Sequence, residues 1–193
     1  RLDMAFHEHN RREYELTRHI SLMQIDPMAI MALRRTGRAR IDIPEALFDM
    51  DGPGQYCRRI HSVALTIPAV GGPQTTISAK LTLLKSSIRT SPEGAGDYAR
   101  TDEDPRFRDQ FGAVESIVAS TAREDAGLFD ASGSDGRPLP FAGRGVIATW
   151  QIELPADPSR GDPQQFDYAS ISDAVLHIRY TAREGGRAMR DAA

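Results

Sequence analysis

Hydrophobic and polar residues alternate in several stretches of the chain, and a period of two predicts β-strands. These stretches are residues 39–43, 57–68, 75–90, 115–121, 145–155 and 174–182. We expect residues 57–68 and 75–90 to form a hairpin, because a Gly-Gly-Pro turn at 71–73 separates them. Neither face of 57–68 is purely apolar, which predicts a strand that is covered on both sides for part of its length.

The first 37 residues instead follow a helical spacing. An apolar stripe at intervals of three or four, interrupted by two polar residues, runs through Leu2, Phe6, His9, Glu13, Leu16, Ile20 and Met23. The polar interruption indicates a helix over 2–23 that packs on a partly polar surface. Asp26-Pro27 begins a second helix, and Gly37 ends it. We therefore expect an αα segment over residues 1–37.

Five or six strands without helical crossovers predict a mainly β fold, an antiparallel β-sandwich with an N-terminal αα helical segment. The predicted organisation is a helical segment at 1–37, the sandwich domain at 38–186 and a tail at 187–193. Residues 44–51 are predicted to form a turn or a helical corner. Residues 91–110 and 156–167 are polar and rich in Pro, Gly and Asp, so they are expected to be loops.

Composition narrows the class of protein. The chain has 193 residues, 40% of them hydrophobic, and a net charge of −3. Such a composition is globular and excludes a strongly basic nucleic-acid binder. Cys57 is the single cysteine, so no intramolecular disulfide is possible. No apolar run is long enough to span a bilayer. Because the chain starts at Arg1, we expect a piece of a longer protein.

The sequence offers only weak candidates for reactive chemistry. His7 and His9 are two residues apart, so on a helix they would point away from each other and could not share a metal ion. His61 and His177 lie in predicted strands, where a general base is less expected than a hydrogen-bonded histidine. Cys57 beside Arg58 could be an activated thiol, but a buried inert thiol is favoured.

The remaining candidates also have simpler interpretations. Asp49 and Asp51, or the acidic run 102–104, lack the order of a Ca²⁺-binding loop and are interpreted as solvated acids. Trp150 is expected in the core, although an outward-facing Trp could stack on a sugar. The arginine pairs at 11–12, 34–35 and 58–59 fit interface anchors and local ion pairs equally well. We expect no catalytic residue, metal or cofactor.

Long strings of the chain resemble one known family. They are EHNRREYELTRHISL (8–22), DPMAIMALRRTGRARIDIPEALFDMDGPGQYCRRIHSVALTIPAV (26–70), GLFD (127–130), LPFAGRGVIATWQIELP (139–155) and FDYASISDAVLHIRYTAREGG (166–186). In this order they resemble the C-terminal TcB-binding domain of the A subunit of Tc toxin complexes. The resemblance runs from residue 2 to about 186, and its gaps fall at 91–110 and 156–163.

The resemblance implies a docking module and not an enzyme. In this family the A subunit is a homopentamer around a channel, and its C-terminal domains bind the β-propeller of the B subunit in the B–C assembly. Binding opens the propeller gate, and a toxic enzyme enters the channel. The resemblance thus implies a secreted or extracellular toxin, with the B and C subunits as partners, no nucleic acid, and membrane contact only through other domains of the parent.

We expect partner contacts at exposed aromatic and arginine side chains, because these residue types dominate interface energetics. The candidates are Phe48, Tyr56, Phe107, Arg108 and Phe111, although Phe48 and Tyr56 also fit an ordinary core. Two other functions remain open at this point. A carbohydrate-binding sandwich would need an outward-facing Trp150, and a hydrolase would need His61 or His177 within hydrogen-bond reach of a carboxylate.

Overall fold

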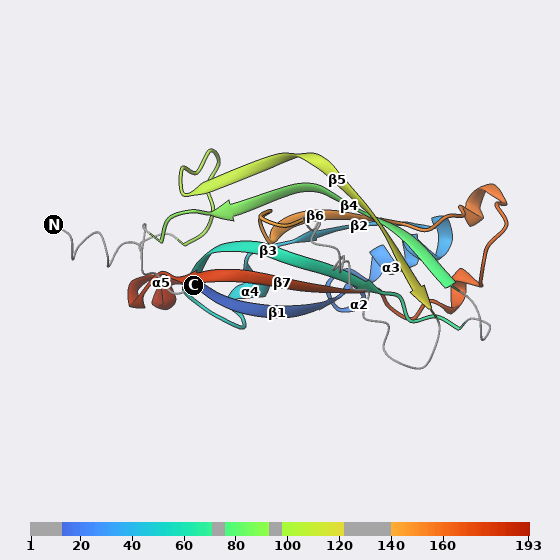
Figure 1. The fold of residues 1–193 in the computed structure, drawn as a ribbon, viewed down its shortest axis with the longest axis horizontal. Helices are drawn as coiled ribbons and strands as arrows, with labels where there is room; N and C mark the ends of the chain where they lie inside the picture. Colours follow the sequence, from blue (N-terminus) through green and yellow to red (C-terminus); the bar gives the residue numbers. More distant parts are fainter. Residues whose placement is uncertain (1–12, 71–75, 93–97, 122–139) are drawn as a thin grey trace.

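Two antiparallel sheets form the body of the protein (Figure 1). The computed structural model describes residues 13–70, 76–92, 98–121 and 140–193. Sheet A has the strand order β1 (Glu13–Ser21), β7 (Val175–Glu184) and β3 (Gln55–Thr66). Sheet B has the order β2 (Arg38–Ile43), β6 (Ile147–Glu153), β4 (Thr76–Arg89) and β5 (Phe107–Thr121). The prediction of a mainly β, antiparallel fold is therefore confirmed.

The helices are short and lie between or beyond the strands. They are α2 (Leu22–Ile25), α3 (Pro27–Thr36), α4 (Ala46–Asp49), the 3₁₀ turns η1 (Pro158–Arg160) and η2 (Tyr168–Ser170), and α5 (Arg187–Ala192). Helix α4 confirms the helical corner expected at 44–51.

One hydrophobic cluster joins the two sheets. Alternate residues of β2, β4, β6 and β7 are buried in it, including Ile41 of β2, Ile152 of β6 and Ile178 of β7. Two edge-to-face aromatic pairs lie within the cluster: Trp150 against Phe141, with ring centres 5.0 Å apart, and Phe48 against Tyr180, at 5.2 Å. Aromatic pairs prefer this geometry because the positive ring edge meets the negative ring face.

The helix expected over residues 2–23 is wrong over 13–21, because Glu13–Ser21 is strand β1. This strand lies along β7 in antiparallel register, with Glu13 opposite Arg183 and Ser21 opposite Val175. EYELTRHIS fits both a period of two and a helical stripe. Pairing with a strand more than 150 residues away overrides the local preference. The residues before Glu13, including His7, His9 and the pair at 11–12, lie outside the described ranges.

The second helix follows its sequence signals closely. Helix α3 begins at Pro27 after Asp26, whose carboxylate accepts the backbone N–H groups of Met28 and Ala29 at 3.0 and 3.3 Å. It ends at Gly37, which has φ +71°. Each signal acts within one helical turn, so it depends on no distant partner. The division of the chain at residue 37 stays a prediction.

The hairpin expected between 57–68 and 75–90 is wrong. Strand β3 pairs with β7 in sheet A, whereas β4 pairs with β5 and β6 in sheet B. Alternation determines which side chains of a strand share a face but does not determine its partner. The connection between these strands crosses from one sheet to the other.

Strand β3 carries polar and apolar residues on both faces, and an irregularity in its pairing explains this pattern. Its register against β7 shifts between Ile60 and Ser62, which leaves His61 as an extra residue. A bulge reverses which parity of residues faces the core. Accordingly Ile60 is buried before the bulge, and Val63 and Leu65 are buried after it. The mixed pattern arises from this bulge, and His61 itself is exposed.

The predicted tail is a short helix that packs on the body. Met189 of α5 is buried in a small cluster with Tyr56, Cys57 and Ile88. The amide of Gly185, just before the helix, donates to the carbonyl of Gly54 at 2.8 Å.

Candidate functional site

The candidate residues of the 91–110 segment lie on a strand rather than in a loop. Strand β5 begins at Phe107, and Phe107 and Arg108 pair with Arg89 and Ile88 of β4. The expectation of a loop through residue 110 is therefore wrong over 107–110. Strand β5 ends the order of sheet B, so its outer side has no neighbouring strand within the described part of the chain. Its side chains are presented from a sheet edge.

Phe111 is the most exposed aromatic of the candidate set, with 72% of its surface accessible. The ammonium of Lys85 lies 5.4 Å from the centre of its ring. Between Leu83 and Lys85 the pairing of β4 with β5 is interrupted, and Gly112 has φ +110°. A glycine is suited to this backbone region because it carries no Cβ. The irregularity lies immediately beside Phe111.

Two arginine side chains contact the aromatic ring of Phe107. The guanidinium carbons of Arg89 and Arg100 lie 4.4 and 4.8 Å from its ring centre. Arg89 also lies 4.3 Å from the ring centre of Tyr98. These contacts fix Phe107 in place, so it is half-buried, while the neighbouring Arg108 is exposed.

Phe48 and Tyr56 are core residues. They are 0% and 2% exposed, and Phe48 packs on Tyr180. The structure therefore brings together Phe107, Arg108 and Phe111 on β5 and separates them from the other two candidates. The core interpretation of Phe48 and Tyr56, which the sequence left open, matches their position.

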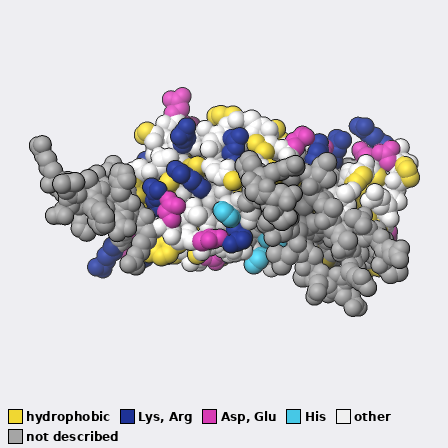
Figure 2. Space-filling view, viewed as in Figure 1, with side chains coloured by type: hydrophobic (Ala, Val, Ile, Leu, Met, Phe, Trp, Pro, Cys, Tyr) yellow, Lys and Arg dark blue, Asp and Glu magenta, His cyan; other side chains and the backbone are white. Residues whose placement is uncertain are grey.

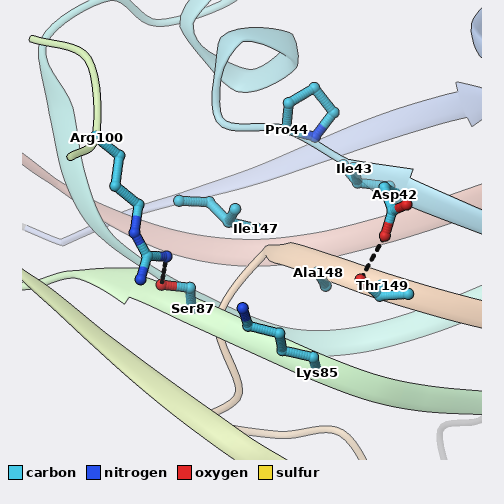
Figure 3. Close-up of a pocket in the computed structure, with 9 residues that line it drawn as sticks. All are labelled: Asp42, Ile43, Pro44, Lys85, Ser87, Arg100, Ile147, Ala148 and Thr149. Carbon is cyan, nitrogen blue, oxygen red and sulfur yellow. Dashed lines mark hydrogen bonds between the residues drawn. The ribbon is translucent and has the colours of Figure 1, made fainter. Parts of the chain in front are cut away.

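A groove of about 360 Å³ opens on the outer face of sheet B, beside Lys85 (Figure 3). Pro44 and Ile147 supply apolar surface, and Lys85 and Arg100 supply positive charge. Asp42 lies on the opposite side, where its carboxylate accepts the hydroxyl of Thr149 at 2.5 Å. Strands β2, β4 and β6 and the segment around Arg100 each contribute to the groove, so no local sequence pattern predicts it.

Arg100 is fixed at the rim of this groove. Its guanidinium donates to the Ser87 hydroxyl at 3.0 Å and to the Asp109 carboxylate at 2.7 Å. The hydrogen bond from Arg100 lowers the pKa of Asp109, and the same contact raises the pKa of Arg100. Both groups therefore stay charged, and Arg100 is committed to an internal partner.

A buried ionic cluster lies behind the groove. Arg89, 3% exposed, donates to both carboxylate oxygens of Glu45, with Nε to Oε1 at 2.9 Å and Nη2 to Oε2 at 2.8 Å. Arg58, also 3% exposed, donates to Asp49 at 2.7 Å and lies 3.6 Å from Glu45. Two arginines thus neutralise two carboxylates away from water, which such burial requires.

This cluster shows the roles of two residues that the sequence left open, Arg58 and Asp49. Arg58 acts inside the molecule rather than as an interface anchor, and Asp49 binds Arg58 rather than solvent. Arg34 likewise donates from Nε to the carbonyl of Ile171 at 2.7 Å. In the acidic run 102–104, Asp104 forms an ion pair with Arg106 at 2.6 Å, and that guanidinium holds the Asp104 pKa well below its usual range.

The histidines have partners other than carboxylates. The Nδ1 atoms of His19 and His177 lie 2.5 Å apart across β1 and β7, and His177 Nε2 lies 2.9 Å from the Thr66 hydroxyl. Partial burial, with a smaller effect of His19, lowers the pKa of His177. In the described ranges no ion pair joins a histidine to a carboxylate, so the contact that a hydrolase would need is not seen there.

Trp150 is fully buried against Phe141, so it offers no stacking platform for a sugar, and the observation that would favour carbohydrate binding is not found. Cys57 is a buried thiol with φ +55°. The described residues contain no group of three or more His, Cys, Asp or Glu side chains placed to hold a metal ion. None of the helices in the described ranges is long and apolar enough to cross a membrane.

Basic and acidic side chains are interspersed over the face shown in Figure 2, with apolar groups between them. An ordered example lies on sheet B. Lys80 contacts Glu153 at 2.6 Å and Glu115 at 3.6 Å, and Arg38 contacts Glu153 at 3.3 Å. This row of four charges crosses all four strands, and each charge in it has an opposite neighbour.

Comparison with known proteins places the chain. The sequence profile of the Tc toxin complex TcA C-terminal TcB-binding domain matches residues 1–182. The chain belongs to this family. The toxin subunit YenA2 of Yersinia entomophaga is 29% identical over 194 residues, and the match covers 96% of the chain and 14% of YenA2. The chain thus spans about a seventh of the length of this relative.

Two solved structures share the fold of this TcB-binding domain. In TcaA-TcaB of Yersinia pseudotuberculosis the match has a TM-score of 0.54 and 21% identity, over 95% of this chain and 10% of that one. In TcdA4 of Morganella morganii the match has a TM-score of 0.51 and 19% identity, and it covers 93% of this chain and 8% of TcdA4. Both likenesses support the same architecture of antiparallel sheets.

Proposed function

We propose that this TcB-binding domain is the docking module of a Tc toxin A subunit and that it binds the B subunit of a B–C assembly. The single observation that carries the proposal is the match of residues 1–182 to the TcB-binding domain family. The proposed role includes delivery of a toxic enzyme through the propeller gate into a channel formed by five A subunits. It assigns no catalytic step to this domain, and it places the toxin outside the producing cell.

The edge of sheet B is the proposed contact surface. Phe111 is 72% exposed and lies beside the Lys85 ammonium, and Arg108, the second residue of β5, is also exposed. An exposed aromatic ring next to cationic groups is typical of the side chains that contribute most to binding at interfaces. Burying Phe111 against a partner would remove apolar surface from water.

The test measures binding of the A subunit that carries this chain to an immobilised B–C assembly by biolayer interferometry. We expect the wild-type subunit to bind and Phe111→Ala to weaken binding about tenfold, the effect of losing roughly 1.4 kcal/mol at an interface anchor. Val70→Ala is the matched control, because Val70 is 79% exposed and is not on the sheet edge.

Two outcomes would contradict the proposal. A wild-type A subunit that does not bind the B–C assembly would overturn the docking function itself. Unchanged affinity in both Phe107→Ala and Phe111→Ala would leave docking in place but would show that the contact surface lies elsewhere.

A further inference from the structure

The outer face of sheet A carries a pair of histidines on neighbouring strands. His19 of β1 is directly opposite His177 of β7, so both imidazoles project from the same side of the sheet. His19 is exposed and His177 is half-buried, and histidine side chains reach the surface on the face drawn in Figure 2. A solute from the surrounding water therefore has access to the pair.

The ring nitrogens of this pair converge between the two strands. The two Nδ1 atoms lie 2.5 Å apart, and the ring planes are inclined at 73°. Without a bound ion, one Nδ1 donates its proton to the other, because a neutral imidazole carries one donor and one acceptor nitrogen. Converging imidazole nitrogens are also the donor atoms that transition-metal ions prefer in proteins.

The second ring nitrogen of His177 has a partner that orients the ring. His177 Nε2 lies 2.9 Å from the Thr66 hydroxyl of β3. When Nε2–H donates to this oxygen, Nδ1 carries the lone pair and faces His19. Metal-binding histidines are usually held in this manner, with the nitrogen that does not bind the metal donating to an oxygen.

The charges around the pair permit a cation to bind. Partial burial, with a smaller effect of His19, lowers the pKa of His177, so this imidazole is neutral near pH 7, as a metal ligand must be. Arg179, two residues further along the same face of β7, is already paired with Glu15 at 2.5 Å. Among the residues that the structure describes, neither histidine forms an ion pair that would compete with a metal ion.

We propose that His19 and His177 form a two-histidine site for a divalent transition-metal ion, with Cu²⁺ or Ni²⁺ preferred to Zn²⁺. The ion takes the place of the proton between the Nδ1 atoms, and that proton is transferred to Nε2 of His19, so both imidazoles stay neutral. Water fills the other coordination positions. The inference is independent of the docking function, and it departs from the expectation of no metal ion because the two ligands are 158 residues apart in the chain.

The preference among ions follows from the distance between the two nitrogens. With metal–nitrogen bonds of about 2.0–2.1 Å, ligands at right angles are about 2.9 Å apart and tetrahedral ligands about 3.3 Å apart. The observed 2.5 Å is closer to the right-angled arrangement, which Cu²⁺ and Ni²⁺ adopt and Zn²⁺ does not favour. A small rotation of the exposed His19 ring is sufficient to reach it.

The first experiment uses the 193-residue chain with His7, His9 and His61 replaced by alanine. The chain has five histidines, so this two-histidine variant keeps only the proposed ligands. Isothermal titration with CuCl₂ should show one bound ion per chain, held more tightly than Zn²⁺. Adding His19→Ala or His177→Ala should weaken Cu²⁺ binding at least about tenfold, because even partners of the ligands contribute that much to metal affinity.

Thermal unfolding with Ni²⁺ gives a second readout. An ion held by both β1 and β7 binds only the folded chain, so it should stabilise the fold. At about 100 times its dissociation constant, Ni²⁺ should raise the unfolding temperature of the two-histidine variant by roughly 5–10 °C. His19→Ala in the same background should lose this rise.

Three results would overturn the inference. Absence of Cu²⁺ and Ni²⁺ binding to the two-histidine variant would show that the pair forms only a hydrogen bond. Equal affinity with and without His19 would place the ion elsewhere on the chain, and tighter binding of Zn²⁺ than of Cu²⁺ would contradict the geometry. If the three background substitutions unfold the chain, wild type is compared with His19→Ala, and wild type should bind one more Cu²⁺.

Discussion

At the scale of single residues, burial decides what each candidate side chain can do. Phe48, Tyr56 and Trp150 are aromatic residues that could have been surface contacts, and all three are at most 2% exposed. Phe111 has the same chemical character and is 72% exposed. Residue type alone does not separate these cases, because an aromatic ring contributes equally well to a core and to an interface. The separation follows from which strand carries the ring and which way it faces.

The His19–His177 pair predicts a pH dependence of stability. Burial lowers the pKa of His177 below its ordinary value of 6.5, so the folded chain binds fewer protons there than the unfolded chain. The stability that this histidine contributes is full above pH 6.5, and it is lost as the pH falls below 6.5 toward the lowered folded pKa. Thr66 and His19 face the ring directly, and neither side chain carries a negative charge that would favour the protonated imidazole.

The measurement is urea unfolding at pH 8.0 and pH 5.5, a window above the titration of ordinary carboxylates. Wild type should lose more stability across this window than His177→Gln. His61→Gln, at the exposed bulge position, should follow the wild type. Equal losses in wild type and His177→Gln would show that the pair does not titrate with folding.

At the scale of elements, side-chain contacts hold strands and short helices that have weak local signals. Strand β1 is held to β7 by Glu13–Arg183 at 2.6 Å and Glu15–Arg179 at 2.5 Å, in addition to the backbone ladder. Helix α4 has no side-chain cap, and Glu45 just before it binds Arg89 of β4. A four-residue helix is not stable by itself, so the buried cluster accounts for its position.

The cluster predicts a large stability cost for Glu45→Ala. Without this carboxylate, the Arg89 guanidinium stays buried with no anionic partner, and Arg58 keeps only Asp49. Removing one partner of a buried ion pair typically costs about 3–5 kcal/mol. Chemical unfolding of the two proteins measures the difference.

Glu13→Ala is the matched control, because the Glu13 carboxylate pairs with Arg183 at an exposed site. An exposed pair contributes at most about 1 kcal/mol. If both substitutions had the same small effect, the buried cluster would not stabilise α4.

At the scale of the whole molecule, one core includes residues from the beginning and the end of the chain. Ile20 and Leu33, from the segment predicted to be a separate helical unit, are buried in the same cluster as Ile152 and Ile178 of the two sheets. Because a shared core couples the elements that form it, the loss of one part exposes the others. We therefore expect the fold to unfold as one unit over these residues.

This arrangement predicts a single cooperative unfolding transition. Trp150 is the only tryptophan and is fully buried, so its fluorescence reports the core between the sheets. Its denaturation curve should coincide with that from far-ultraviolet circular dichroism, which reports all strands and helices. A separate earlier transition in circular dichroism would instead support an independent unit over residues 1–37.

The sequence by itself determined the elements whose signals are local. Helix α3 was predicted from Asp26-Pro27 and Gly37, and the strands β2, β4, β6 and β7 were predicted from alternation, because capping and alternation involve neighbouring residues only. The long strings shared with the TcB-binding domain also placed the chain in its family.

Only the tertiary structure decided which strands pair and which side chains meet. It made Glu13–Ser21 a strand through contact with β7, placed β3 and β4 in different sheets, and assembled the Lys85 groove from four separate segments. These contacts join residues far apart in the chain, and their free energy exists only when both partners are present. A local sequence pattern therefore does not predict these contacts.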